Sequence, residues 1–128
     1  MFSHVMVGSL DLERSRRFYD AVLGTLGVKP GFLDRHRVFW RSPAGGAFGV
    51  TLPINGQAAT VANGGTIGFA CDRPDQVDAW HAAGLANGGS TCEDPPGIRE
   101  GTTGRLYLAY LRDPDGNKLC AMHRLPKA

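Results

Sequence analysis

Two residues that lie far apart in the sequence could form a thiolate–imidazole pair. His4 lies in the apolar segment FSHVMVG at residues 2–8, and Cys120 lies in the segment KLCAMH at residues 118–123. Both segments have the composition of β-strands, in which alternate side chains share one face. An imidazole beside a thiol lowers the thiol pKa and favours the nucleophilic thiolate. We therefore predict Cys120 and His4 as catalytic residues if they face one cavity, and Cys120 as a packed small hydrophobe if they do not.

A third candidate residue is Arg99, in the segment CEDPPGIREGTTGR at residues 92–105. This segment is rich in Gly and Pro and adds length to the second half of the chain, so we expect a mobile loop there. Arginine pairs well with carboxylate and phosphate groups. Two interpretations of Arg99 remain open: a group that orients an anionic ligand at a pocket mouth, or a solvated charge.

Helical and strand patterns alternate along the chain that positions these residues. Phe18, Val22 and Leu26 recur every four residues and predict a helix over residues 11–27. Pro74 begins a second predicted helix over residues 74–86. Short apolar runs beside Gly/Pro turns are typical of strands. The predicted strands cover residues 2–8, 36–41, 47–53, 64–71, 106–111 and 118–123.

The second half of the chain repeats the plan of the first half. Adding 62 to a residue number takes His4 to Thr66, and adding 71 takes Gly49 to Cys120. Repetition of this kind indicates two copies of one structural unit. We therefore predict the α+β class, with two tandem βαβββ units that form a curled mixed β-sheet cup of eight strands with helices on its outer face. The predicted boundaries are residues 1–54 and 64–124 for the units and 1–128 for the single domain.

This plan resembles the vicinal oxygen chelate superfamily, which includes glyoxalase I, bleomycin-resistance proteins and extradiol dioxygenases. The resemblance is carried by His4, by the helix LERSRRFYDAVLG and by the segment YLRDPDGNKLCAMH. It covers the whole chain and is more specific for fold than for reaction. It implies a homodimer that binds a small polar molecule in the sheet cavity. Three functions are compatible with it: a lyase, isomerase or dioxygenase, a non-catalytic protein that sequesters a small ligand, or a structural dimer with no small-molecule role.

Metal-dependent members of that superfamily hold a divalent ion with four ligands from the first and last strands of each unit. The positions carried over onto this chain are His4, Gly49, Thr66 and Cys120. Gly49 has no side chain and Thr66 is a weak ligand, so His4 is the one full match. We expect an incomplete metal site at His4 and no tightly bound divalent metal. The residues predicted to contact a ligand in the cavity are Thr66, Arg99, Trp40, Tyr107 and Met122.

Composition excludes several other classes of function. Fourteen Lys and Arg against twelve Asp and Glu give a net charge of +2 without a basic block, which argues against nucleic-acid binding. No apolar run approaches the roughly 18 residues of a membrane span. The three cysteines are widely spaced, which predicts free thiols and a cytoplasmic protein.

Overall fold

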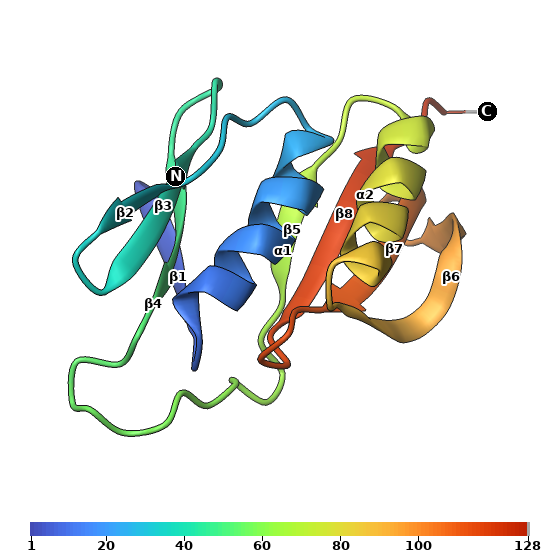
Figure 1. The fold of residues 1–128 in the computed structure, drawn as a ribbon. Coiled ribbons are helices and arrows are strands. Elements are labelled where there is room, and N and C mark those ends of the chain that lie inside the picture. Colours follow the sequence, from blue (N-terminus) through green and yellow to red (C-terminus); the bar gives the residue numbers. More distant parts are fainter. Residues whose placement is uncertain (128) are drawn as a thin grey trace.

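The computed structural model describes residues 1–127, which form two helices and eight strands in two units (Figure 1). Ala128, the last residue of the predicted domain, lies outside the described residues. The elements of the first unit are β1 (His4–Gly8), α1 (Leu12–Gly24), β2 (Phe32–Asp34), β3 (Arg37–Arg41) and β4 (Ala47–Thr51). The elements of the second unit are β5 (Ile67–Ala70), α2 (Pro74–Ala86), β6 (Ser90–Gly101), β7 (Gly104–Arg112) and β8 (Lys118–Arg124).

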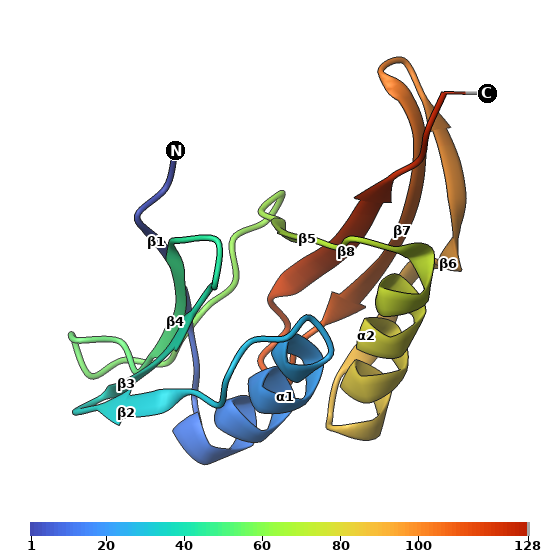
Figure 2. The ribbon, with the colours of Figure 1, turned by 90° about the horizontal axis from the view of Figure 1, so that it is seen from above.

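Each unit forms one mixed four-stranded sheet. The strand order is β1-β4-β3-β2 in the first sheet and β5-β8-β7-β6 in the second, and the β1–β4 and β5–β8 pairs are parallel. Within residues 1–127 no strand pairing joins the two sheets, so the eight strands form two sheets rather than one. Figure 2 shows the two helices side by side, with both sheets diverging from them. The predicted α+β plan of two tandem βαβββ units with outer helices is confirmed.

Helix α1 covers the first sheet with one buried stripe. It begins after Asp11, whose carboxylate accepts a hydrogen bond from the backbone N–H of Arg14 at 3.1 Å. Phe18, Tyr19 and Val22 lie three and four residues apart and are fully buried. The predicted helix over residues 11–27 is confirmed in position, although it ends three residues earlier.

Helix α2 packs closely against both α1 and the second sheet. It starts at Pro74, where proline is compatible with the first turn, and it buries Trp80 completely. A Cβ atom at Gly84 would lie 2.2 Å from Leu111 Cδ1 and 3.3 Å from Phe18 Cε2. Only glycine therefore permits this approach of α2 to β7 and α1.

A row of aromatic rings connects the cores of the two units. The centroids of Tyr19 and Phe48 are 4.7 Å apart, and those of Phe48 and Phe69 are 5.4 Å apart in an edge-to-face arrangement. Phe69 in turn lies 6.4 Å from Trp80. These are the spacings at which aromatic pairs attract one another. The core is therefore continuous from the first sheet to helix α2.

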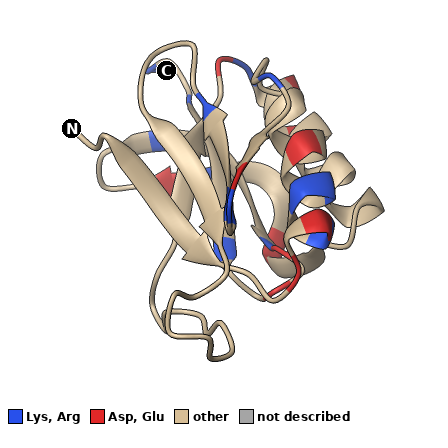
Figure 3. Ribbon diagram, turned by 60° about the vertical axis from the view of Figure 1, so that its left-hand side comes forward, with Lys and Arg blue, Asp and Glu red and all other residues tan. Residues whose placement is uncertain are grey.

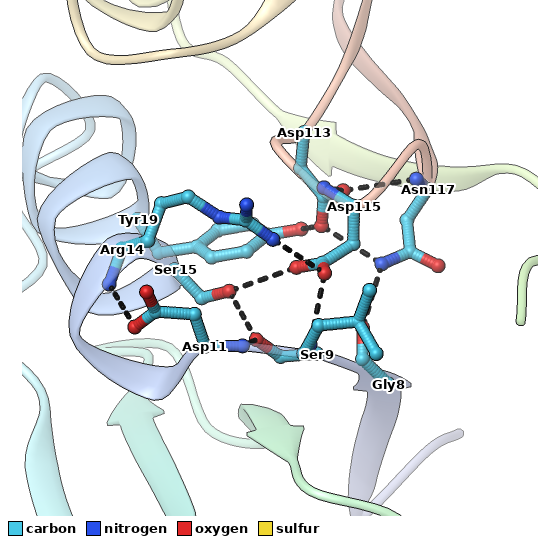
Figure 4. A network of polar contacts seen from close by, with 10 residues as sticks. Gly8, Ser9, Asp11, Arg14, Ser15, Tyr19, Asp113, Asp115 and Asn117 are labelled. Atoms are coloured by element: carbon cyan, nitrogen blue, oxygen red, sulfur yellow. Dashed lines mark hydrogen bonds and ion pairs between the residues drawn. The ribbon is translucent and has the colours of Figure 1, made fainter. Parts of the chain in front are cut away.

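The DPDGN turn between β7 and β8 forms a polar connection between the units (Figure 4). The buried carboxylate of Asp113 accepts the Tyr19 hydroxyl at 2.6 Å and the Asn117 side-chain amide at 2.9 Å. Its other oxygen accepts the backbone N–H groups of Asp115 and Asn117, both at 2.9 Å. The Asn117 amide also donates to the Gly8 carbonyl at 3.0 Å. Asp113 and Asn117 thus join the turn to both α1 and β1.

Asp115 completes this connection at the start of α1 (Figure 4). One of its oxygens accepts the Leu10 backbone N–H at 2.9 Å and the Arg14 guanidinium at 2.8 Å. The other accepts the Ser15 hydroxyl at 3.1 Å. Because both carboxylates of the turn and the amide nitrogen of Asn117 have protein partners, the motif that carried the family resemblance has a structural role here.

The segment at residues 92–105, predicted as a mobile loop, instead belongs to a β-hairpin. Strand β6 pairs with β7 from Gly97 opposite Leu108 to Gly101 opposite Gly104. The register shifts between Cys92 and Gly97, and the two prolines of the segment fall in this bulge. Proline has no N–H to donate to a ladder, and a bulge requires none there. The loop prediction is therefore wrong, because the prolines interrupt the strand only locally.

Candidate functional site

A cleft of about 440 Å³ lies at the boundary between the two units. Its walls come from β1, the residues that follow α1, the β3–β4 turn and β5. Phe48 and Phe69, which face each other from the two units, both line it. The other apolar lining side chains include Phe2, Val5, Leu23, Leu26, Val28, Trp40 and Ile67.

The apolar lining follows from strand alternation in the first sheet. Val5 pairs with Phe48, and Phe48 pairs with Trp40, so these three side chains share the face that α1 covers. Leu23, near the C-terminal end of α1, and Leu26, just beyond it, also line the cleft. An apolar surface of this kind favours the apolar part of a small molecule.

Two ionisable residues, His4 and Asp72, are among the residues that line the same cleft. His4 is exposed on β1, and its Nδ1 atom is hydrogen-bonded to the Ser3 hydroxyl at 2.7 Å. Asp72 follows β5, and its backbone N–H donates to the Gln76 side chain at 2.7 Å. Among residues 1–127 no side chain is hydrogen-bonded or ion-paired to the Asp72 carboxylate. The lining of the cleft therefore includes two ionisable residues beside its apolar residues.

Cys120 and Met122 lie on the second sheet's face that points away from the helices. Cys120 pairs with Gly68 on β5 and with Tyr110 on β7. Burial raises the pKa of the Cys120 thiol to about 11, and this outweighs the lowering effect of a hydrogen bond with Tyr110. Cys120 does not line the cleft that contains His4. A cavity shared with His4 was expected to lower the pKa of the Cys120 thiol, but the structure raises this pKa.

The remaining predicted ligand contacts are dispersed over the second unit, apart from Trp40, which lines the cleft with His4. The Tyr107 hydroxyl donates to Asp78 of α2 at 2.7 Å and so points to the helix side of the sheet. Thr66 lies before β5, in a separate hollow beside the linker. The Arg99 guanidinium donates to the carbonyl groups of Asp94 and Pro95, at 3.1 and 2.9 Å, within its own strand.

A comparison with protein families identifies this architecture. The family model for the glyoxalase/bleomycin resistance protein/dioxygenase superfamily matches residues 1–121. The chain belongs to this superfamily. Among solved structures, a glyoxalase/bleomycin resistance protein from Albidiferax ferrireducens is 68% identical, with a TM-score of 0.94 over 97% of this chain and 99% of that chain.

More distant members of the superfamily share the fold. A glyoxalase-related enzyme from Fulvimarina pelagi is 21% identical, with a TM-score of 0.72 over 97% of this chain and 88% of that chain. A family enzyme from Burkholderia phytofirmans is 18% identical, with a TM-score of 0.71 over 96% of this chain and 98% of that chain. No curated protein matches this sequence.

The four positions at which metal-dependent members hold a divalent ion do not fit one in this member. A Cβ atom at Gly49 would lie 2.3 Å from Met6 Sδ and 2.9 Å from Phe39 Cε1, so those side chains occupy the space of a ligand there. Cys120 has a raised pKa and would bind a metal only after losing its proton. Within residues 1–127 no three His, Cys, Asp or Glu side chains are grouped to hold a metal ion.

Several site residues were not predicted from the sequence. Three residues that line the cleft were missed: Asp72, Leu26 and Phe69. Of these, Asp72 alone carried a signal in the sequence, because it directly follows a predicted strand. No helix among the described residues has the length and apolar character required to cross a bilayer.

Proposed function

We propose that this superfamily member binds a small, largely apolar molecule in the cleft, without a bound metal and without covalent chemistry. The observation that carries the proposal is the apolar cleft with His4 and Asp72 in its lining. Its volume of about 440 Å³ is in the usual range for small-molecule sites. His4 and Asp72 supply a hydrogen-bonding group and a charge that would orient the polar end of the ligand.

The state of Cys120 favours binding over catalysis. A thiol with a pKa of about 11 is almost fully protonated at neutral pH and is therefore a weak nucleophile. The nucleophile and the imidazole of the predicted catalytic pair also belong to different surfaces, since Cys120 lies outside the cleft. These observations support the sequestering alternative over the pair of Cys120 and His4.

A second candidate function rests on the two ionisable groups of the cleft. A metal-independent isomerase or lyase would use His4 to move a proton of the bound substrate, with Asp72 as a further charged group of the cleft. Incubation with dihydroxyacetone in D₂O tests this, because proton abstraction next to the carbonyl group exchanges deuterium into the substrate. Exchange that disappears in His4→Gln would favour the enzyme, and exchange equal to the buffer rate would favour sequestration.

We also propose that the protein is a cytoplasmic homodimer. Large apolar side chains of the first unit are exposed, with Phe2 at 73% and Leu33 at 57% of full exposure. Exposed apolar surface of this kind is typical of protein interfaces. The free thiols of Cys71, Cys92 and Cys120 are compatible with a reducing compartment. Sedimentation equilibrium is expected to give twice the mass of the chain, and a monomer at micromolar concentration would contradict the dimer.

The proposed binding is tested with N-phenyl-1-naphthylamine, an uncharged probe whose fluorescence increases in apolar surroundings. We expect saturable binding at one site per chain. Leu26→Trp places a larger side chain in the cleft and is expected to raise the dissociation constant at least about tenfold. The control Leu10→Trp introduces the same residue at an exposed position outside the cleft and is expected to change affinity less than about twofold.

Two outcomes would contradict the proposal. One is a probe that binds both tryptophan variants as tightly as the parent protein, provided that both retain the parent circular dichroism spectrum. The other is a metal-dependent site. We expect Zn²⁺ or Ni²⁺ to shift the thermal midpoint by less than about 1 °C. One equivalent of either metal retained through dialysis, with the retention lost in His4→Ala, would show that a metal site exists.

A further inference from the structure

A hollow of about 650 Å³ lies beside the second sheet and shares no lining residue with the cleft. One side is the linker at residues 61–66, and the other is formed by the end of β7, the turn and the start of β8. None of its lining residues, all within the described part of the chain, is acidic. We call it the basic hollow, and its side-chain hydrogen-bond donors are Asn63, Thr66, Arg112 and Lys118.

Two cationic residues face each other across the strands at the basic hollow. Arg112 ends β7 and Lys118 begins β8, and the two residues are paired in the ladder. Figure 3 shows lysine and arginine residues on strands as well as on the helices. One Arg112 nitrogen donates to the Gly116 carbonyl at 2.8 Å, and among residues 1–127 the guanidinium has no other hydrogen-bond acceptor.

Lys118 is held by two neighbours on the open face of the second sheet. Its Nζ atom lies 4.7 Å from the centroid of the Tyr110 ring, which is a cation–π contact. The same ammonium group forms an ion pair with Glu93. Glu93 has a φ of 58°, in the left-handed region that non-glycine residues rarely adopt, and it lies in the β6 bulge. The bulge thus directs a carboxylate onto the cation of the hollow.

Neutral donors of the hollow lie opposite these cations. Thr66 is exposed and immediately precedes β5, and Asn63 lies in the turn that Gly64 forms with a φ of 92°. Among residues 1–127 no protein group is hydrogen-bonded to the Thr66 hydroxyl or the Asn63 amide. Two cations, a hydroxyl and an amide together form a donor set suited to an oxyanion.

We propose that the basic hollow binds the oxyanion group, phosphate or carboxylate, of a small anionic molecule, and that Glu93 competes with this ligand for Lys118. Arg112 supplies a planar pair of donors to two oxygens, and Lys118 supplies a point charge. When the anion binds, the Lys118 ammonium exchanges the Glu93 carboxylate for a ligand oxygen, and no bond is made or broken. The site is independent of the cleft and of the function proposed for it.

The test uses inorganic phosphate as the probe and amide chemical shifts of the full chain as the measurement. Ionic strength is held constant with NaCl, so that shifts report binding and not screening. We expect the largest shifts at residues 63–66 and 112–118. Arg112→Gln and Lys118→Gln are each expected to raise the dissociation constant at least about fivefold, and Lys118→Arg is expected to restore most of the affinity.

The effect of Glu93→Gln on phosphate affinity tests whether Glu93 competes with the ligand. This variant removes the competing carboxylate while retaining a side chain of the same size, so phosphate is expected to bind about threefold more tightly. Arg17→Gln is the control, because Arg17 is an exposed arginine on α1 outside the hollow. Acetate in place of phosphate distinguishes the two oxyanions, and the tighter binder identifies the ligand group.

The proposal is overturned if phosphate shifts are spread over the surface or if Arg17→Gln weakens binding as much as Arg112→Gln. It is also overturned if Glu93→Gln weakens binding, because Glu93 would then not be a competitor. Binding of N-phenyl-1-naphthylamine is expected to be unchanged in Arg112→Gln, so failure of this site and failure of the cleft are distinguishable.

Discussion

The hydrogen bond between Tyr19 and Asp113 should be a major contribution to the stability of the fold. Tyr19 is 0% exposed and Asp113 is 3% exposed, and the hydroxyl donates to the carboxylate at 2.6 Å. A hydrogen bond to a charged group contributes about 1.5–3 kcal/mol, and its loss leaves part of a buried carboxylate unsatisfied. Tyr19→Phe is therefore expected to lower the free energy of unfolding by about 2 kcal/mol.

Tyr107 provides a matched control for this prediction. Its hydroxyl donates to Asp78 at 2.7 Å, a similar distance, but this hydrogen bond is exposed to solvent. Water replaces the lost partner at an exposed site, so Tyr107→Phe is expected to cost less than about 0.5 kcal/mol. The two substitutions remove the same atom and differ in the burial of the bond.

Urea unfolding at pH 7, followed by fluorescence of the buried Trp40 and Trp80, measures both variants. With a slope of roughly 1–3 kcal/mol per molar urea, Tyr19→Phe should lower the unfolding midpoint by about 1 M. The midpoint of Tyr107→Phe should remain close to that of the parent protein. Equal losses in the two variants, or a loss below about 0.5 kcal/mol in Tyr19→Phe, would refute the reasoning from burial.

Three further predictions follow from the pKa shifts and from the hairpin. At pH 8 a small alkylating reagent should modify the half-buried Cys92 before Cys71 and Cys120, because burial raises the pKa of both buried thiols to about 11; faster reaction of Cys120, read by mass spectrometry, would contradict this. The contribution of these two thiols to stability should be constant below about pH 9 and be lost as pH rises through about 11, because they keep their protons to higher pH in the folded state than in the unfolded chain; Tyr19, whose pKa is raised well above 10 by burial and by Asp113, acts in the same direction. The amides of residues 97–101 that pair with β7 should be protected in hydrogen exchange without any ligand, and free exchange there would restore the mobile loop.

Local patterns in the sequence were sufficient to predict the two helices and most strands. Phe18 and Val22 form a stripe that only a helix buries on one side, and Pro74 marks the start of α2. Strand β6 was not predicted in this way, although its pairing with β7 over residues 97–108 is a local hairpin. The prolines and glycines that indicated a loop are accommodated in a bulge, which local composition does not reveal.

The candidate site was predictable only in part. The sequence indicated His4 and Trp40 as site residues, and both line the cleft. Alternation placed Cys120 and Met122 on one face of their strand, but it could not tell whether that face borders the cleft. Whether Cys120 meets His4 depends on how the two sheets lie relative to each other, and short-range periodicity carries no information about that arrangement.

The DPDGN turn shows which features the sequence determines and which depend on the tertiary structure. By itself the sequence determined that a tight turn follows β7, because Asp, Pro, Gly and Asn adopt the required backbone angles locally. Only the tertiary structure decided that Asp113 and Asp115 bind α1, almost 100 residues earlier in the chain. Turn formation depends on neighbouring residues, whereas these hydrogen bonds form only after both units have folded and excluded water around the carboxylates.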